Sequence, residues 1–365
     1  VSFPIPILRL INSKVLFYCH YPDKLLSTQR SSSIMRFYRF FLDTFEELTT
    51  GMAQTIVVNS GFTQQVFLDN FPIIGASKSK KSDEVVKQDG LLIASHMPRI
   101  LYPPINLKVF EKSENYSSQK IEDLLEGKIT PGKTHVLTSL NRYERKKNIP
   151  LALKAFANFL ERTSQKTGKA ESEIDATLVV AGGWDPRVEE NVGHEKELRQ
   201  LAKELGITAK MVFLKSISND QRLMLLENTN VLLYTPENEH FGIVPVEAMH
   251  MGCIVMACNS GGPLESVANG ETGFLNPPKP DLWGEKIFGL LEASPDPERV
   301  KKMQAAAKKR VKDNFVMDVF ASNLDKYVQE MQPLSGFNYM AGTILFFMSV
   351  AWGVLMSCKV LLFGA

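Results

Sequence analysis

The chain has 365 residues, with 42 Lys and Arg against 40 Asp and Glu, which gives a formal net charge of +2. This length is enough for two domains of ordinary size and a tail. The near balance of charge excludes a protein that binds nucleic acid through a strong basic field, so we expect no nucleic-acid partner.

The first region of the chain predicts a small α/β domain. Its opening, "VSFPIPILRL", is apolar but interrupted by two prolines, so we expect a buried strand or an interfacial loop. The runs "KVLFYCHYP" (14–22) and "TIVVNS" (55–60) are typical of strands, and a helix is expected over 61–70. We interpret residues 1–105 as a partial Rossmann-like domain with two or three strands, because a complete one is usually larger.

A second, complete α/β domain is expected over residues 106–330. Four or five apolar, β-branched runs alternate there with amphipathic helical segments, which is the pattern of a parallel, doubly wound sheet. Those runs are "HVLTSL" (135–140), "ATLVVAGGW" (176–184), "MVFLKSIS" (211–218), "NVLLYTP" (230–236) and "CIVMACNSGG" (253–262). Ligands of such sheets bind at the carboxyl ends of the strands, so the loops that follow these runs are the candidates for a site.

The end of the chain predicts a hydrophobic membrane segment over residues 337–365. The run "YMAGTILFFMSVAWGVLMSC" (339–358) carries no charge over about the ~20 residues needed to cross a bilayer. A buried core helix of this length would normally show a polar face, which favours a membrane anchor. The sequence leaves open whether the segment spans the bilayer or lies in one leaflet.

The stretch "NEHFGIVPVEAM" (238–249) holds two glutamates, Glu239 and Glu247, with a glycine and a proline between them. A helix over the whole stretch is therefore unlikely to form, and proline fits best in a first helical turn. We expect Glu239 in a loop and Glu247 inside a helix that begins near Val244 and ends at Gly252. The first amides of that helix would offer a site suited to an anion. The amides of Gly242, Ile243 and Val244 are expected to face this anion, and Phe241 beside them is expected to contact the same ligand.

Three further loops follow strands at the same edge of the sheet. Arg142 and Lys147 stand five positions apart, and such a pair suits a diphosphate because arginine supplies a planar fork and lysine a compact charge. An ordinary basic surface loop is the alternative. Gly182 and Gly183 would let the backbone approach a ligand closely, or simply form a turn. The fourth loop, "NSGGPLESV" (259–267), again places two glycines between a strand and a helix.

Together these loops are consistent with a site for a nucleoside diphosphate sugar. Arg142, Lys147 and the helix amides would hold the diphosphate. Glu247 would accept hydrogen bonds from a ribose, and Glu239 would reach the hydroxyls of the sugar. Carboxylates in such a site need these partners, because burying an unpaired carboxylate costs several kcal/mol.

These residues also resemble a known family. Glu239 and Glu247, with "HFGIVPVEAM", resemble the paired-glutamate motif of the retaining family-four glycosyltransferases, and Arg142 with Lys147 matches that family's diphosphate pair. Within the family, "FYCHYPD", "SLNRYERKKNIPLAL" and "GGWDPRVEENVGHEKEL" are most similar to the alpha-1,3/1,6-mannosyltransferases of dolichol-linked oligosaccharide synthesis. The resemblance extends from Val15 to Asp325.

The resemblance implies an α/β GT-B fold, with two Rossmann-like domains facing a cleft, the N-terminal one incomplete, and a C-terminal hydrophobic helix. It implies that mannose passes from GDP-mannose to Man-GlcNAc2-PP-dolichol, first in alpha-1,3 and then in alpha-1,6 linkage, with retention of configuration. Protein cations and amides stabilise the leaving diphosphate in this family, so no cofactor and no obligatory metal are expected. His20 matches the histidine that the family places near the reacting sugar, which makes His20 and Glu239 the expected catalytic residues.

Location and partners follow from the same resemblance. We expect the endoplasmic reticulum membrane, with the catalytic domains facing the cytosol, where GDP-mannose is found. Four cysteines without CxxC spacing agree with a reducing compartment. The resemblance also leaves room for assembly with other mannosyltransferases of the pathway.

Two alternatives stay open. The charged residues named above do not read a base, so another nucleotide sugar, such as UDP-glucose, could be the donor. A membrane-anchored binding subunit without activity is the other alternative. Because the Gly-rich loop that normally follows the first strand of the family is missing, we expect the isolated chain to be poorly active.

Overall fold

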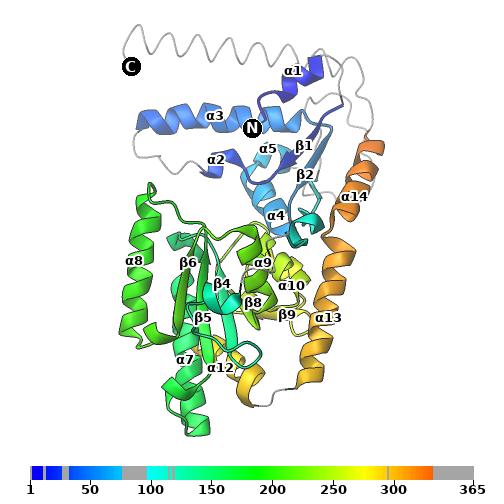
Figure 1. Ribbon diagram of the computed structural model, residues 1–365. Helices are drawn as coiled ribbons and strands as arrows, with labels where there is room; N and C mark the ends of the chain where they lie inside the picture. The colour runs from blue at the N-terminus through cyan, green and yellow to red at the C-terminus, as the bar shows by residue number, and fades with distance from the viewer. Residues whose placement is uncertain are drawn as a thin grey trace. The chain divides into compact units, whose positions relative to one another are not determined.

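The computed structural model describes residues 2–10, 14–26, 33–75, 97–113, 116, 120–293 and 296–331. The chain forms two compact units (Figure 1). The N-terminal unit comprises the chain up to Tyr102 and the part that begins at Ala321, and the C-terminal unit is Pro103–Phe320. The hydrophobic segment expected at 337–365 lies outside the described residues. Among the helices that are described, none is both long and apolar enough to cross a membrane.

The N-terminal unit is built on a parallel three-stranded sheet in the order β1-β2-β3. Its strands are β1 (Leu16–Cys19), β2 (Thr55–Val58) and β3 (Arg99–Ile100). Its helices are α1 (Ile5–Leu10), α2 (Asp23–Leu26), α3 (Ser33–Gly51), α4 (Gly61–Asn70), α5 (Pro72–Gly75) and most of α14 (Met317–Gln329). Both strands expected here and the helix over 61–70 are confirmed.

The core of this unit lies between its sheet and α4. Phe67 and Phe71 are fully buried, with their rings stacked at a centroid distance of 4.3 Å, beside Ile56 and Val58 of β2. At the other end of the described chain, the Tyr327 hydroxyl of α14 donates to the Ile100 carbonyl at 2.9 Å. That contact ties α14 to the edge strand of the same unit.

The opening segment is a helix, and the expectation of a strand or loop there is wrong. Helix α1 begins at Ile5, so the first proline precedes it and the second, Pro6, falls in its first turn. The missing N–H of proline is not needed at that point of a helix. Leu8 N donates to the Pro4 carbonyl at 3.0 Å, and Ile5 packs into the core of the unit.

The C-terminal unit is a parallel six-stranded sheet in the order β6-β5-β4-β7-β8-β9. Its strands are β4 (His135–Leu140), β5 (Ala176–Gly182), β6 (Met211–Lys215), β7 (Val231–Tyr234), β8 (Ile254–Cys258) and β9 (Gly273–Asn276). Its α-helices are α6 (Ile121–Leu124), α7 (Ile149–Thr167), α8 (Glu189–Glu204), α9 (Asn219–Glu227), α10 (Ile243–Met251), α11 (Pro263–Ser266), α12 (Pro280–Phe288) and α13 (Pro297–Asn314). The order is that of a Rossmann fold, with one strand, β9, beyond the four or five expected.

Helices α7 and α12 cover the core of this unit (Figure 1). They approach closely because Gly284 of α12 has no side chain: a Cβ there would lie 2.5 Å from Asn158 Oδ1 of α7. Trp283 beside it is fully buried, and its indole N–H donates to the Pro277 carbonyl at 2.8 Å. Two apolar helices packed against parallel strands are what the alternating sequence pattern predicts.

The strand order reverses between β4 and β7, which lie side by side. Leu137 pairs with Val231 and Thr138 with Leu232, so both strands end at the same edge of the sheet. The first crossover from β4 leads to β5 on one side, whereas β7 continues on the other. Ligands of open α/β sheets bind in the crevice at such a reversal.

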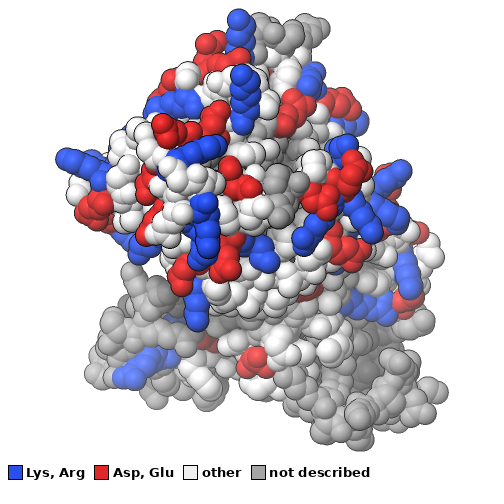
Figure 2. Space-filling view, turned by 90° about the horizontal axis from the view of Figure 1, so that it is seen from below, with Lys and Arg blue, Asp and Glu red and all other residues white. Residues whose placement is uncertain are grey.

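Figure 2 shows one face of the molecule with its charged side chains coloured. Lys and Arg are interspersed there with Asp and Glu, and the described side chains on that face form no extended field of one sign. The mixture agrees with the formal net charge of +2.

Candidate functional site

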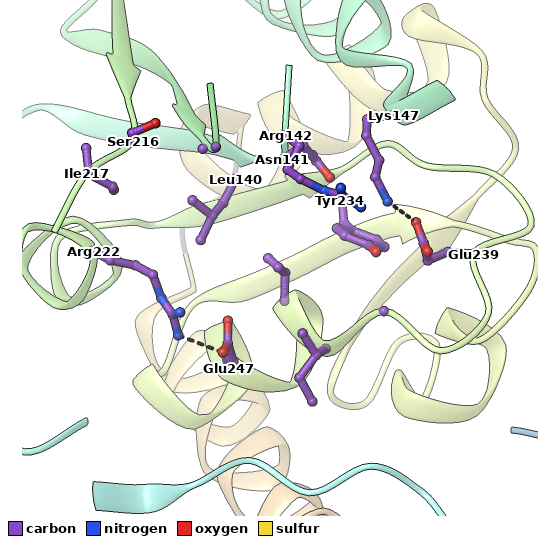
Figure 3. A pocket seen from close by; sticks show the side chains of 15 residues that line it. Leu140, Asn141, Arg142, Lys147, Ser216, Ile217, Arg222, Tyr234, Glu239 and Glu247 are labelled. Atoms are coloured by element: carbon purple, nitrogen blue, oxygen red, sulfur yellow. Dashed lines mark hydrogen bonds and ion pairs between the residues drawn. The ribbon is translucent and has the colours of Figure 1, made fainter. Parts of the chain in front are cut away.

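A pocket of about 480 Å³ opens at the carboxyl ends of the strands of the C-terminal unit (Figure 3). Its wall is formed by the ends of β4, β5 and β7, by the loops that follow β4, β5, β6 and β7, by α9 and by α10. The lining residues are Leu140, Asn141, Arg142, Lys147, Gly182, Gly183, Ser216, Ile217, Arg222, Tyr234, Glu239, Gly242, Ile243, Val244 and Glu247.

The two expected cations lie on the loop after β4. Lys147 ends a short 3-10 helix, η4 (Arg145–Lys147), and its side chain is only 12% exposed. Its carbonyl accepts a 2.7 Å hydrogen bond from the Thr235 hydroxyl, which ties this loop to the end of β7. Arg142 is exposed, and its Nη1 lies 2.9 Å from a carboxylate oxygen of Glu144. Lys147 is therefore fixed by its surroundings, whereas Arg142 stands at the rim.

Tyr143 and α8 hold this cation loop in place. Tyr143 is fully buried, and its hydroxyl donates to the carbonyls of Val180 and Leu214 at 3.0 and 3.2 Å. Asn191 of α8 donates from Nδ2 to the Tyr143 carbonyl at 3.0 Å, and its Oδ1 accepts from Asp185 N at 3.0 Å. One side chain thus joins the loop after β4 to the loop after β5.

Gly182 and Gly183 line the pocket and let the end of β5 approach the cation loop, whereas their approach to a ligand stays a prediction. Gly182 has a φ of +151°, and a Cβ on it would lie 2.0 Å from the Asn141 carbonyl oxygen. A Cβ on Gly183 would lie 3.3 Å from Cγ of Arg142. The end of β5 therefore packs against the start of the cation loop, and no other residue fits at Gly182.

The helix expected within "NEHFGIVPVEAM" is present. Helix α10 begins at Ile243, one residue earlier than expected, and ends at Gly252, whose φ is +91°. Gly242 precedes the helix with a φ of +80°, a left-handed conformation that favours glycine. Gly242, Ile243 and Val244 line the pocket, so the first turn of the helix faces it.

Glu239 lies in the loop before α10, as expected. Its Oε2 forms an ion pair with Nζ of Lys147, drawn as a dashed line in Figure 3. The loop rests on "NSGG": Gly262 N donates to the Glu239 carbonyl at 2.7 Å, and a Cβ on Gly261 would lie 2.4 Å from that oxygen. The fourth loop thus supports Glu239 and does not itself line the pocket, which corrects the expectation of four converging loops.

Glu247 lies one turn into α10, and its Oε1 is 2.6 Å from Nη2 of Arg222. Burial raises the pKa of the Glu247 carboxyl above its ordinary value, and the charge of Arg222 opposes that rise. Arg222 is a site residue that sequence reasoning missed, because it stands on α9 and no short motif links it to Glu247.

The two glutamates share one arrangement. Each has one carboxylate oxygen paired with a cation, Lys147 for Glu239 and Arg222 for Glu247 (Figure 3). Within the described part of the chain, no hydrogen bond or ion pair engages Glu239 Oε1 or Glu247 Oε2. A carboxylate is an acceptor-only group, so each keeps one oxygen for a hydroxyl of a ligand.

Two further expected site residues are Phe241, which precedes α10, and His20, which belongs to the N-terminal unit. Phe241 does not line the pocket; it is buried, with its ring centroid 5.6 Å from that of Phe315. Gly262 leaves room for the backbone of Phe241, which anchors the loop, and a donor contact of Phe241 stays a prediction. His20 follows β1 in the N-terminal unit, with its ring edge-on to Tyr18 at 4.5 Å. Burial lowers the pKa of His20, and its catalytic role stays a prediction.

Among the described residues, no group of three or more His, Cys, Asp or Glu side chains could hold a metal ion. Cys19, Cys253 and Cys258 are buried and free. Burial raises the pKa of each of these thiols to about 12. Thiols with such pKa values are protonated and unreactive near neutral pH.

Known proteins resemble the chain over most of its length. The family model described as "Glycosyl transferases group 1" matches residues 121–310, within the unit that holds the pocket. Alpha-1,3/1,6-mannosyltransferase ALG2 of Dictyostelium discoideum is 42% identical over 336 residues, which cover 91% of this chain and 74% of that protein. The protein of the same name from Homo sapiens is 41% identical over 335 residues, covering 91% and 72%. The chain belongs to the alpha-1,3/1,6-mannosyltransferase ALG2 family.

A solved structure agrees with this ALG2 assignment in fold. Anabaena Alr3699/HepE in complex with UDP is 17% identical and superposes with a TM-score of 0.65, over 90% of this chain and 77% of that one. At this identity the likeness concerns the fold alone, two α/β domains with parallel sheets of the GT-B type. The family resemblance and the GT-B fold inferred from the motifs are therefore confirmed for this ALG2 relative, and it is a mannosyltransferase.

Proposed function

We propose that the pocket of the C-terminal unit binds GDP-mannose and that the chain transfers its mannose to a lipid-linked oligosaccharide. One observation carries the proposal: two cation–carboxylate pairs, Lys147 with Glu239 and Arg222 with Glu247, line one pocket at the carboxyl ends of the strands. A nucleoside diphosphate sugar needs cations for its phosphates and acceptors for its hydroxyls, and both occur here. The ALG2 relatives do not favour another nucleotide sugar or an inactive binding subunit.

In this proposal, cationic groups of the pocket bind the diphosphate and carboxylates bind the sugar hydroxyls. Arg142, Lys147 and the first turn of α10 stabilise the charge that develops on the leaving diphosphate. Glu247 accepts from the ribose and Glu239 from the hydroxyls of mannose. Since protein groups meet the developing charge, no obligatory metal or other cofactor belongs to the proposal.

The proposed acceptor is Man-GlcNAc2-PP-dolichol, which receives one mannose in alpha-1,3 and then one in alpha-1,6 linkage, with retention of configuration. Both linkages appear in the name of the ALG2 relatives. His20 is proposed to act near the reacting sugar, on the ground of the family resemblance.

The proposed location is the endoplasmic reticulum membrane, with both units facing the cytosol. A lipid-linked acceptor requires a membrane surface, and the buried free thiols of Cys19, Cys253 and Cys258 agree with a reducing compartment. Assembly with other mannosyltransferases of the pathway is a further part of this proposal.

A transfer assay tests the function. The full chain, in detergent, would receive GDP-mannose labelled in its sugar and a short-lipid analogue of Man-GlcNAc2-PP-dolichol, and the products would be digested with linkage-specific mannosidases. We expect two sequential additions, an alpha-1,3 and an alpha-1,6 mannose, by the wild type. Glu239→Gln should abolish both, whereas Glu204→Gln, on an exposed turn of α8, should not. Label transferred from UDP-glucose but not from GDP-mannose would contradict the proposal.

A further inference from the structure

Arg222 occupies a fixed place at the start of α9, where it lines the pocket beside Glu247 (Figure 3). A capping box fixes this helix end: Ser218 Oγ accepts from Gln221 N at 3.2 Å, and Gln221 Oε1 accepts from Ser218 N at 2.9 Å. Arg222 N then donates to the Ser218 carbonyl at 2.9 Å. The backbone that carries the guanidinium is therefore set by local hydrogen bonds.

An aromatic ring holds the guanidinium from another side. Arg222 lies over the ring of Phe110, 5.8 Å from its centroid, and Phe110 packs edge-on against His250 of α10 at 4.8 Å. Phe110 ends the 3-10 helix η2 (Leu107–Phe110), which is tied to α9 by a 2.8 Å hydrogen bond from Asn219 Nδ2 to the Val109 carbonyl. Three elements thus meet around Arg222.

The pair that Arg222 makes with Glu247 is shielded from water. The two side chains are only 25% and 13% exposed, and the 2.6 Å contact uses Oε1 of the carboxylate. Nε and Nη2 of Arg222 are buried and make no hydrogen bond of good geometry among the described residues, so the contact with Glu247 is an ion pair. Since breaking a shielded pair leaves an uncompensated charge, each partner depends on the other.

We infer that Arg222 is a positioning residue that turns Glu247 Oε1 away from the ligand and presents Oε2, as an acceptor, to a ribose hydroxyl. The inference rests on the proposed function, because it assumes that a nucleotide occupies the pocket. Arg222 itself does not touch the reacting atoms in this account. Its role is to fix which oxygen the nucleotide meets.

Nucleotide binding in this account depends on the charge of the Glu247 carboxylate as well as on the orientation of its oxygens. A protonated carboxyl would turn one acceptor into a donor, which a ribose hydroxyl cannot use in the same way. Burial raises the pKa of Glu247, and Arg222 is the group that opposes this. Without Arg222 the carboxyl takes up its proton at a higher pH, so nucleotide binding is lost earlier on acidification.

The elements packed against α10 carry other titratable groups. They are His250 on α10 itself, Asp220 and Glu227 of α9, Tyr234 of β7, Cys258 of β8, Glu265 of α11, and on α13 Glu298, Arg299, Lys301, Lys302, Lys308, Lys309, Arg310, Lys312 and Asp313. Arg222 of α9 is the charge that acts on the pKa of Glu247. Replacing Arg222 should therefore shift the titration of Glu247 while these other groups stay in place.

The test measures the affinity of the full chain for GDP by calorimetry, at several pH values from acid to neutral. The proteins compared with the wild type are Arg222→Gln, Arg222→Lys, Glu247→Gln and the double variant Arg222→Gln/Glu247→Gln. We expect Arg222→Gln to weaken binding roughly tenfold at neutral pH and to move the midpoint of the acid loss to higher pH. Arg222→Lys should recover much of the affinity, because it keeps the charge. In the Glu247→Gln background, Arg222→Gln should cost little more.

A matched control is Arg199→Gln on α8. Arg199 also pairs with a glutamate, Glu195, and also lies over an aromatic ring, 4.5 Å from the centroid of Phe213, but it does not line the pocket. Its loss should leave GDP affinity unchanged, and thermal unfolding would verify that every variant is folded. Fully additive losses for Arg222 and Glu247, or an unshifted midpoint in Arg222→Gln, would overturn the inference. A wild type that binds no GDP would overturn the proposed function and this inference with it.

Discussion

Two neighbouring lysines of the cation loop differ sharply in their surroundings. Lys147 is 12% exposed and pairs with Glu239, whereas Lys146 is 67% exposed and lies 3.2 Å from a carboxylate oxygen of Glu144. A cation held in a shielded position interacts more strongly with a phosphate than one that water screens. The pocket therefore depends on Lys147 in particular.

Replacing Lys147 by alanine should weaken GDP binding by about 2 kcal/mol, or roughly thirtyfold, because a charge-assisted contact to the diphosphate is lost. Calorimetry measures this directly. Lys146→Ala is the matched control, and it should change the affinity by less than about twofold. Equal losses in the two variants would mean that only the general charge of the loop matters.

Gly262 is a residue on which the place of the Glu239 loop depends. A Cβ there would lie 2.2 Å from Cα of Phe241, a backbone atom that cannot move without its loop. Gly262→Ala should lower the free energy of unfolding by about 1–3 kcal/mol and reduce transfer, as measured by chemical denaturation and by the mannosyl assay. Gly289→Ala serves as the control, because nothing lies within 4 Å of a Cβ at that position. Equal stability of the two variants would show that the loop adapts.

Some residues of this site can be predicted from the sequence, and others cannot. Glu239 and Glu247 share one short stretch, and Arg142 with Lys147 directly follows a strand, so spacing alone brings them to notice. Arg222 stands within "NDQRLMLLE", where a charged residue on an amphipathic helix is ordinary. Only the packing of α9 beside α10 places it against Glu247.

At the scale of elements, α8 decides where the cation loop lies. Asn191 joins that loop to the one after β5, and Arg145 N donates to Glu190 Oε1 at 3.0 Å at the start of the same helix. The run "GGWDPRVEENVGHEKEL", noticed for its family resemblance, supplies Asn191 and Glu190. The structural use of Asn191 and Glu190 is to hold the loop that carries Arg142 and Lys147, and neither of the two lines the pocket.

Asn191→Ala should weaken GDP binding roughly fivefold, since two hydrogen bonds that align the loops are lost at about 0.5–1.5 kcal/mol each and part of the loss falls on stability. Asn191→Asp keeps the acceptor for Asp185 N but not the donor to the Tyr143 carbonyl, so we expect an intermediate affinity. Calorimetry on both variants checks the order. Gln200→Ala, which removes only an exposed contact to Glu204, should bind as the wild type does. A wild-type affinity in Asn191→Ala would contradict this role of α8.

The elements themselves follow from the sequence where periodicity is strong. Helix α4 and the strands from β4 to β8 lie where apolar runs predict them. Strand β9 (Gly273–Asn276) was not expected, because its sequence GFLN has no β-branched residue and its Gly and Asn are depleted in strands. The segment of α1 was wrongly predicted as a strand or loop because it contains two prolines. Prolines are compatible with a helix only where they fall before it or in its first turn, as they do here.

At the scale of the whole molecule, the two ends of the C-terminal unit contact each other. Ile105, near its start, donates from its backbone N to the Phe315 carbonyl at 2.8 Å and forms a bridge with Val316, near its end. Every residue that lines the pocket belongs to this unit. We therefore expect this unit to retain nucleotide binding when it is produced alone.

A protein comprising Pro103–Phe320 alone should fold cooperatively and bind GDP within about threefold of the full chain, a difference of less than ~1 kcal/mol. It should transfer no mannose, because His20 and the rest of the N-terminal unit are removed. Circular dichroism during heating and calorimetry with GDP measure the first two properties. Cooperative unfolding without GDP binding would contradict the placement of the whole nucleotide site in this unit.

The most direct test of the whole account is a calorimetric titration of the full chain with GDP-mannose, GDP, UDP-glucose and UDP, with Arg142→Ala and Glu247→Ala as controls. We expect the two guanine nucleotides to bind, the two uracil nucleotides not to bind, and both variants to bind GDP more weakly than the wild type does. Equal binding of UDP-glucose, or GDP binding of wild-type affinity in both variants, would contradict a GDP-mannose site built on these residues.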